Sequence, residues 1–70
     1  MIEVKAEIVG TVWKIVTRPG DVVSEDQTLL VLESMKMEIE VVAPKAGTVE
    51  EIKVKETELV KEGQVLVLLS

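Results

Sequence analysis

One lysine stands where a side chain could do chemistry. Lys36 lies between Met35 and Met37, after the apolar run 28–32 and before the alternating run 39–43. A polar tip between two strand-like runs predicts a β-hairpin with this lysine at its apex. An exposed primary amine on a rigid turn is a handle that another enzyme can acylate.

The chain offers little other chemistry. It contains no histidine and no cysteine, so imidazole bases, Ser-His-Asp triads, thiolate metal sites and disulfides are all excluded. The adjacent acids Glu50 and Glu51 are expected on opposite faces of a strand, where they cannot work as a pair. We therefore predict no catalytic residue and no metal site, and we do not expect an enzyme in its own right.

The two methionines are unusual residues for a tight turn. Gly, Asn, Asp and Pro have physical reasons to occupy such turns, and none is present between Glu33 and Glu38. One interpretation is a solvated turn whose methionines cap the core. The other is a soft apolar patch that a modifying enzyme grips.

Length and composition predict one small all-β domain spanning residues 1–70. The core draws on Val, Ile and Leu, because Phe and Tyr are absent and Trp13 is the sole aromatic residue. Branched side chains favour strands. The net charge of −5, with both signs interspersed, disfavours nucleic acid and anionic membranes. No run has the length of a membrane span or the apolar core of a signal peptide, so we expect a cytoplasmic, monomeric domain.

The chain repeats itself at an offset of 37 residues. Ten identities relate residues 6–33 (copy one) to residues 43–70 (copy two). The identical pairs are Ala6 and Ala43, Gly10 and Gly47, Thr11 and Thr48, Val12 and Val49, Ile15 and Ile52, Val23 and Val60, Glu25 and Glu62, Gln27 and Gln64, Leu29 and Leu66, and Leu32 and Leu69. Neither copy can bury its apolar face alone, so the two are expected to pack together.

This repeat predicts a flattened barrel or sandwich, a barrel-sandwich hybrid. It should consist of two small, mostly antiparallel sheets related by a pseudo-twofold axis. The copies meet in sequence at residues 34–42, so the central hairpin with Lys36 should stand at one end and the two termini near the other. The first strand is expected to run from Ile2 to Ile8, where apolar and polar residues alternate.

The two copies differ at their turns. Copy one has Gly20 and Asp26 where copy two has Thr57 and Gly63. Threonine tolerates a positive φ poorly. We therefore expect the turn at Thr57 to relax into a type I geometry.

The segment Glu33-Ser34-Met35-Lys36-Met37-Glu38, followed by Ala43-Pro44 and Gly47, resembles the biotinyl-attachment signature of biotin carboxyl carrier domains. The resemblance covers essentially the whole chain. It is closest to the small stand-alone biotin/lipoyl attachment proteins of bacteria, because Ser34 replaces the alanine of most carriers. It implies that Lys36 forms an amide with biotin, which biotin protein ligase first activates as an adenylate. Met35 and Met37 would be the recognition flank for the ligase. Glu33 and Glu38 would either contribute to ligase docking or form a solvated rim, and Ser34 would be a further flanking residue.

The resemblance also implies a shuttle. A biotin on Lys36 would be a mobile swinging arm that takes carboxybiotin from a biotin carboxylase to a carboxyltransferase. Two alternatives stay open. Lys36 could carry lipoate instead, although lipoyl domains usually have an acidic residue before the lysine and a small one after it. The fold could also serve as a structural barrel-sandwich interaction module.

Overall fold

The computed structural model describes all 70 residues and contains strands but no helix. The all-β prediction is therefore confirmed. The strands are β1 (Ile2–Lys5), β2 (Gly10–Ile15), β3 (Val22–Val23), β4 (Thr28–Ser34), β5 (Met37–Val42), β6 (Gly47–Ile52), β7 (Leu59–Val60) and β8 (Val65–Leu69).

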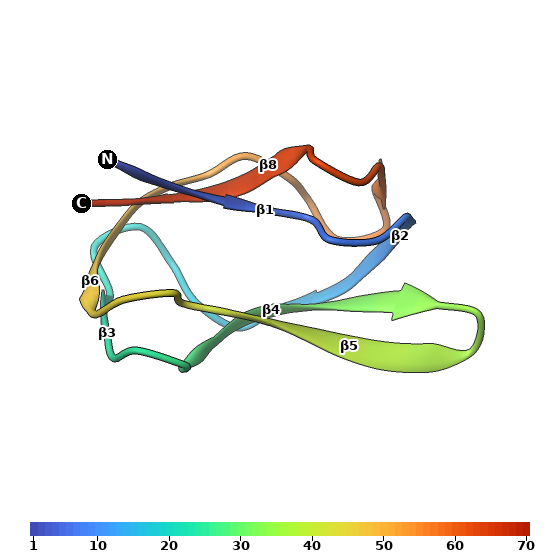
Figure 1. The fold of residues 1–70 in the computed structure, drawn as a ribbon, viewed down its shortest axis with the longest axis horizontal. Coiled ribbons are helices and arrows are strands. Elements are labelled where there is room, and N and C mark those ends of the chain that lie inside the picture. Colours follow the sequence, from blue (N-terminus) through green and yellow to red (C-terminus); the bar gives the residue numbers. More distant parts are fainter.

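The strands form two four-stranded antiparallel sheets, which face each other as two layers (Figure 1). One sheet has the order β1-β8-β6-β3 and the other β5-β4-β2-β7. The short strand β3 of copy one pairs with β6 of copy two, and β7 of copy two pairs with β2 of copy one. The two copies are thus interlocked, each lending one strand to the sheet of the other.

Hydrogen bonds repeat at the same offset as the residues. The N–H of Gly20 donates to the carbonyl of Val49 at 2.7 Å, and the N–H of Thr57 donates to the carbonyl of Val12 at 2.7 Å. Each bond joins one copy to the other, and the 37-residue offset converts the first into the second. The pseudo-twofold prediction is confirmed by this exchange.

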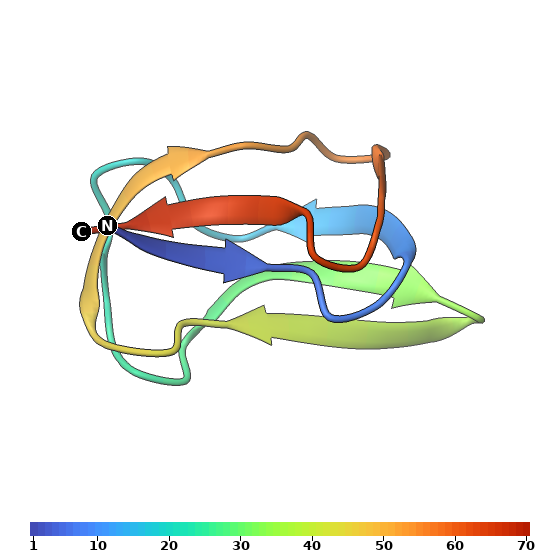
Figure 2. The ribbon, with the colours of Figure 1, turned by 45° about the horizontal axis from the view of Figure 1, so that its top comes forward.

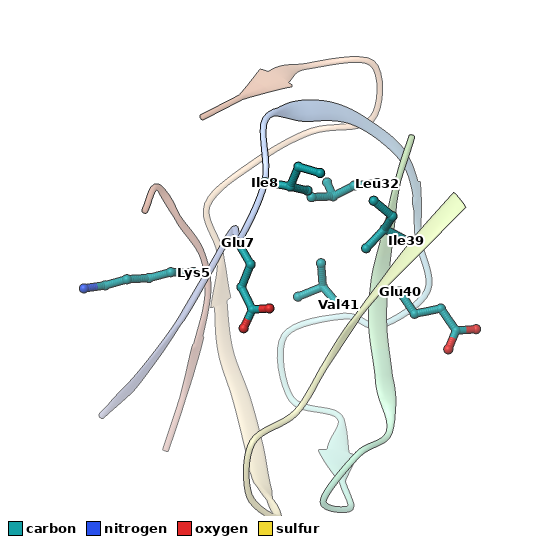
Figure 3. Close-up of a pocket in the computed structure, with 7 residues that line it drawn as sticks. All are labelled: Lys5, Glu7, Ile8, Leu32, Ile39, Glu40 and Val41. Atoms are coloured by element: carbon teal, nitrogen blue, oxygen red, sulfur yellow. The ribbon is translucent and has the colours of Figure 1, made fainter. Parts of the chain in front are cut away.

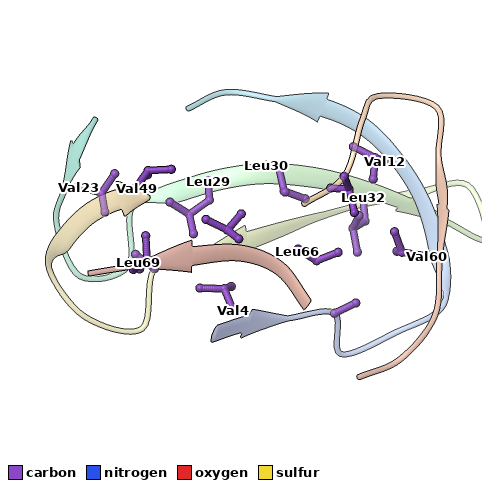
Figure 4. Close-up of a cluster of buried hydrophobic side chains, with 14 residues drawn as sticks. Val4, Val12, Val23, Leu29, Leu30, Leu32, Val49, Val60, Leu66 and Leu69 are labelled. Atoms are coloured by element: carbon purple, nitrogen blue, oxygen red, sulfur yellow. The ribbon is translucent and has the colours of Figure 1, made fainter. Parts of the chain in front are cut away.

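The core lies between the two sheets and contains fourteen buried aliphatic side chains (Figure 4). Most of them form equivalent pairs from the two copies, which explains why the repeat keeps apolar residues at these places. The pairs are Ala6 and Ala43, Val12 and Val49, Val23 and Val60, Leu29 and Leu66, Leu30 and Val67, and Leu32 and Leu69. Thr17, the buried polar residue, donates its hydroxyl to the carbonyl of Leu29 at 3.1 Å.

The expectation for the turn at Thr57 is wrong. Its φ is +76°, in the left-handed region, as is that of the equivalent Gly20 at +96°. Hydrogen bonds hold this geometry: Thr57 N–H donates to Val12, and Glu58 N–H donates to the Lys55 carbonyl at 3.1 Å. The Glu58 carboxylate in turn accepts from Lys55 N–H at 3.1 Å. Tertiary pairing therefore overrides the local preference of threonine.

Replacing Thr57 by glycine should stabilise the domain by roughly 0.5–1 kcal/mol. Relief of the left-handed strain contributes about 1–2 kcal/mol, and the greater entropy of glycine in the unfolded chain offsets part of it. Urea unfolding of the Thr57→Gly variant measures the difference. The matched control, Gly20→Thr at the equivalent turn, should lose about 1 kcal/mol. A Thr57→Gly variant less stable than wild type would contradict the strain assignment.

The first strand is shorter than expected. Its pairing register with β8 shifts between Val4 and Lys5, and Ala6 then donates its N–H to the Gln64 carbonyl at 2.9 Å. This bond turns Ala6 into the core and ends the strand three residues before the predicted end at Ile8. The side chain of Ile8 consequently lies at the surface, 36% exposed.

The hairpin and the chain termini lie at opposite ends of the molecule. In both ribbon views the β4–β5 hairpin projects at one end, and the two termini lie together at the other (Figures 1 and 2). The domain measures 30 × 17 × 17 Å. The predicted placement of the hairpin opposite the termini is confirmed.

Candidate functional site

The hairpin tip is a two-residue turn. Glu33 pairs with Glu38 and Ser34 with Met37, which leaves only Met35 and Lys36 between the strands. Their φ values are +52° and +65°. Positive φ at both central residues defines a type I′ turn, whose twist matches that of the two strands.

The two residues of this turn are not ones that stabilise a type I′ turn. Type I′ turns favour Asn-Gly, whereas Met35 and Lys36 have bulky side chains that make the left-handed conformation costly by about 1–2 kcal/mol each. Strain of this kind persists where the surrounding structure enforces it, and it clusters at functional sites. The strain at this tip therefore makes these two side chains candidates for a function.

The side chains of the tip point into solvent. Met35 is 90% exposed and Met37 is 64% exposed, so the interpretation in which the methionines cap the core is wrong. Lys36 is also exposed and forms no ion pair. The two ion pairs of the structure lie elsewhere, within β1 (Lys5 and Glu3) and at the end of β6 (Lys53 and Glu51).

Strand β2 braces the stem of the hairpin. A Cβ atom at Gly10 would lie 2.8 Å from the carbonyl oxygen of Glu33 and 3.5 Å from the Cβ of Ser34. Only glycine allows this close approach, since real Cβ atoms do not come that near to a carbonyl. The stem is thus held up to Ser34, and only the turn projects beyond it. The repetition of Gly10 as Gly47 in copy two was the sign of this requirement in the sequence.

Two acidic residues flank the tip. Glu33 and Glu38 face each other across the ladder, both are exposed, and neither is ion-paired. Ser34 lies between them and the turn and is half-buried. The structure therefore brings the six predicted residues, 33–38, together in one projecting tip.

Beside the stem lies a small cavity that the sequence did not predict (Figure 3). Its volume is about 70 Å³, and it lies between the β1–β2 connection and the β4–β5 hairpin. Ile8, which was expected inside a strand, forms one of its walls. The lining residues are Lys5, Glu7, Ile8, Leu32, Ile39, Glu40 and Val41.

The site provides a nucleophile without the means to activate it. No cluster of three or more acidic, histidine or cysteine side chains is placed to hold a metal ion. No helix of the kind that crosses a bilayer occurs in the fold. The fold and site together define a class of protein: a small β-domain that exposes one lysine at the end of a projecting hairpin.

Comparison with known proteins identifies the family. The family model described as "Biotin-requiring enzyme" matches residues 2–69. The chain therefore belongs to the biotin–lipoyl family, as the resemblance of its hairpin implied.

Two relatives are similar in sequence. The "Biotinylated protein TB7.3 homolog" of Mycolicibacterium smegmatis is 54% identical over 41 residues, which are 59% of this chain and 58% of that protein. The biotin carboxyl carrier protein of Streptococcus mutans is 51% identical over 41 residues, 59% of this chain and 32% of that protein. The match thus spans less than two thirds of the length of either relative.

Two solved structures share the fold. The urea carboxylase of Kluyveromyces lactis matches with a TM-score of 0.94 and 30% identity, over 99% of this chain and 6% of that one. The lipoyl domain of the 2-oxoglutarate dehydrogenase complex from Azotobacter vinelandii matches with a TM-score of 0.83 and 30% identity, over 100% of this chain and 96% of that one. The scaffold is therefore shared with part of a carboxylase and with a lipoyl domain.

Proposed function

We propose that this domain is a biotin carrier and that Lys36 is its biotinylated residue. The observation that carries the proposal is the tip itself, where an unpaired lysine occupies a strained two-residue turn between two exposed methionines. Biotin protein ligase would activate the carboxylate of biotin as an adenylate. The Lys36 amine, deprotonated by the ligase, attacks the acyl carbon, so that a C–N amide bond forms as AMP leaves.

The residues beside the lysine favour biotin over lipoate. The scaffold itself does not discriminate, because a lipoyl domain superimposes along its whole length. Met35 and Met37 stand where lipoyl domains usually have an acidic and a small residue, and the relative from M. smegmatis is named as biotinylated. Lipoylation of Lys36 remains the second candidate, and it is separated from biotinylation by the experiment below.

The domain acts as a carrier and not as an enzyme. Its side chains supply no base for bond breaking, so carboxylation and transfer belong to partner proteins. We propose a biotin carboxylase and a carboxyltransferase as these partners. This proposal is supported by the match between the fold of this chain and part of a urea carboxylase. Tethering the cofactor gives it a high effective concentration at both partners. The same role fits a monomeric domain in the cytoplasm.

The test is the intact mass of the protein after co-expression with a biotin protein ligase and added biotin. The expected result is one biotinyl increment, assigned to Lys36 by peptide fragmentation. An unmodified mass would contradict the proposal, and a lipoyl increment after exposure to a lipoyl ligase would replace it with the second candidate. If neither ligase modified the domain, the remaining interpretation would be a structural interaction module.

Replacing Met35 and Met37 together by alanine should slow biotinylation by about tenfold or more without unfolding the domain. Their side chains are exposed, so their loss removes apolar contacts with the ligase and little of the core. Ligase kinetics and thermal unfolding measure the two effects. A control variant, Val22→Ala, removes an exposed apolar side chain far from the tip and should change neither. A large fall in the unfolding midpoint of the double variant would instead show that the methionines stabilise the fold.

A further inference from the structure

We propose that the ligase docks not only on the turn but also on the cavity beside the hairpin stem. This flank cavity has walls of Ile8, Leu32, Ile39 and Val41. Its partner would be a protein surface with one apolar side chain surrounded by basic groups. The inference rests on the proposed function and adds to it a recognition surface outside residues 33–38.

The pseudo-twofold repeat provides an internal control for what the fold requires. Ile8 corresponds to Lys45, a charged residue that occupies the equivalent place in copy two. Val41 is half-buried beside the cavity, whereas its equivalent Val4 is buried, and the structure has no second cavity there. The fold therefore forms without an apolar residue at the position of Ile8 and without a cavity. Both features occur only at the end of the domain that displays Lys36.

The position of the flank cavity favours the ligase among the proposed partners. Leu32 and Ile39 form the third pair below the turn, so the cavity lies roughly 10 Å from Lys36 at about 3.4 Å per residue. The ligase must bring its activated acyl group to the amine itself, so its surface must cover the turn and the upper stem. A carboxylase or transferase acts at the ring end of the biotinyl arm and has no such need.

Charge and side-chain orientation define the partner's chemistry. Figure 3 shows the Lys5 amine and the Glu40 carboxylate pointing away from the cavity, so that its lining combines four apolar side chains with the Glu7 carboxylate. Two carboxylates of the lining, those of Glu7 and Glu40, are exposed and have no ion-pair partner, and the unpaired Glu33 and Glu38 follow nearer the turn. Lys5, the one cation of the lining, is already paired within β1. An apolar side chain with a basic surround complements this surface and would also be steered toward it.

The test is the steady-state kinetics of biotin protein ligase on the apo-domain with Ile8→Lys. This change installs the residue that copy two already tolerates, so the unfolding midpoint should be unchanged. We expect the KM for the domain to rise about tenfold and kcat to stay within about twofold. Val22→Lys is the matched control: it makes the same change at an 81% exposed site in β3, at the opposite end, and should leave KM unaltered.

Two further variants separate the effect of the apolar side chain from the effect of charge. Ile8→Ser removes the apolar side chain without adding charge and should raise KM in the same direction, even if Ile8→Lys were to unfold. Glu7→Gln with Glu40→Gln should weaken the salt dependence of kcat/KM. Unchanged KM for both Ile8 variants, or an equal rise for Val22→Lys, would overturn the docking proposal while Lys36 is still biotinylated. A wild-type domain that takes up no biotin would overturn the proposed function instead.

Discussion

Replacing Lys36 by arginine is expected to leave the domain folded and wholly unmodified. Arginine keeps the positive charge, but its guanidinium remains protonated at all accessible pH values and cannot act as the acyl acceptor. The side chain of Lys36 is exposed and makes no ion pair, so the fold loses no contact. Intact mass after exposure to ligase and biotin, together with thermal unfolding, measures both parts of this expectation.

The variant also tests how the ligase chooses its lysine. Six other lysines are present, and none of them occupies a turn between methionines. Lys45→Arg, at an exposed site in copy two, is the control and should accept biotin like the wild type. Any biotin on the Lys36→Arg protein would show that another lysine is modified, and the site assignment would be wrong.

Truncating Leu66 to alanine should remove much of the stability of the whole domain. The side chain is fully buried between the sheets, and such a change typically costs about 2–5 kcal/mol. A 70-residue domain has a total of only roughly 4–10 kcal/mol. Urea unfolding should therefore show a strongly lowered midpoint, and biotinylation should fall only as far as the protein unfolds.

The equivalent residue in copy one makes this a test of the interlocked core. Leu29→Ala should produce a similar loss, because Leu29 is buried to the same degree in the other half of the repeat. Leu59→Ala, at a 65% exposed site, should change stability by less than about 0.5 kcal/mol. Each sheet contains strands of both copies, so every variant should unfold in one transition. Two separate transitions would contradict the shared core.

The residues that stabilise the domain and the residues that are exposed at the hairpin tip lie in different parts of the molecule. The paired apolar residues of the two copies hold the sheets together, and Gly10 lets β2 brace the stem. The turn itself, with Met35 and Lys36 in left-handed conformations, is less stable than an Asn-Gly turn would be. The scaffold therefore carries a strained tip whose exposed side chains contribute nothing to the core, an arrangement consistent with the proposed modification of Lys36.

Local alternation and the fixed offset made much of the fold predictable. The apolar run before Lys36 and the period-two pattern after it identified the hairpin, because both patterns are typical of strands. The 37-residue offset identified the two copies and placed the tip opposite the termini. Composition also directed attention to the tip, since a chain without histidine or cysteine leaves an exposed lysine as its candidate for modification.

Local rules failed where contacts distant in sequence decide the conformation. Thr57 keeps a positive φ because its N–H is bound by Val12, 45 positions earlier in the chain. Strand β1 ends before Ile8 because Ala6 is held by Gln64. Neither partner can be recognised from neighbouring residues, so intrinsic preference gave the wrong expectation at both places.

The amino-acid sequence by itself determined the all-β class, the repeat and the hairpin with the lysine at its apex, because these follow from periodicity and from residue chemistry. The tertiary structure alone decided the exchange of β3 and β7 between the sheets, and the cavity between Ile8 and the hairpin. Both depend on how two sheets pack against each other. That packing joins residues far apart in the chain, and no pattern within a single strand records it.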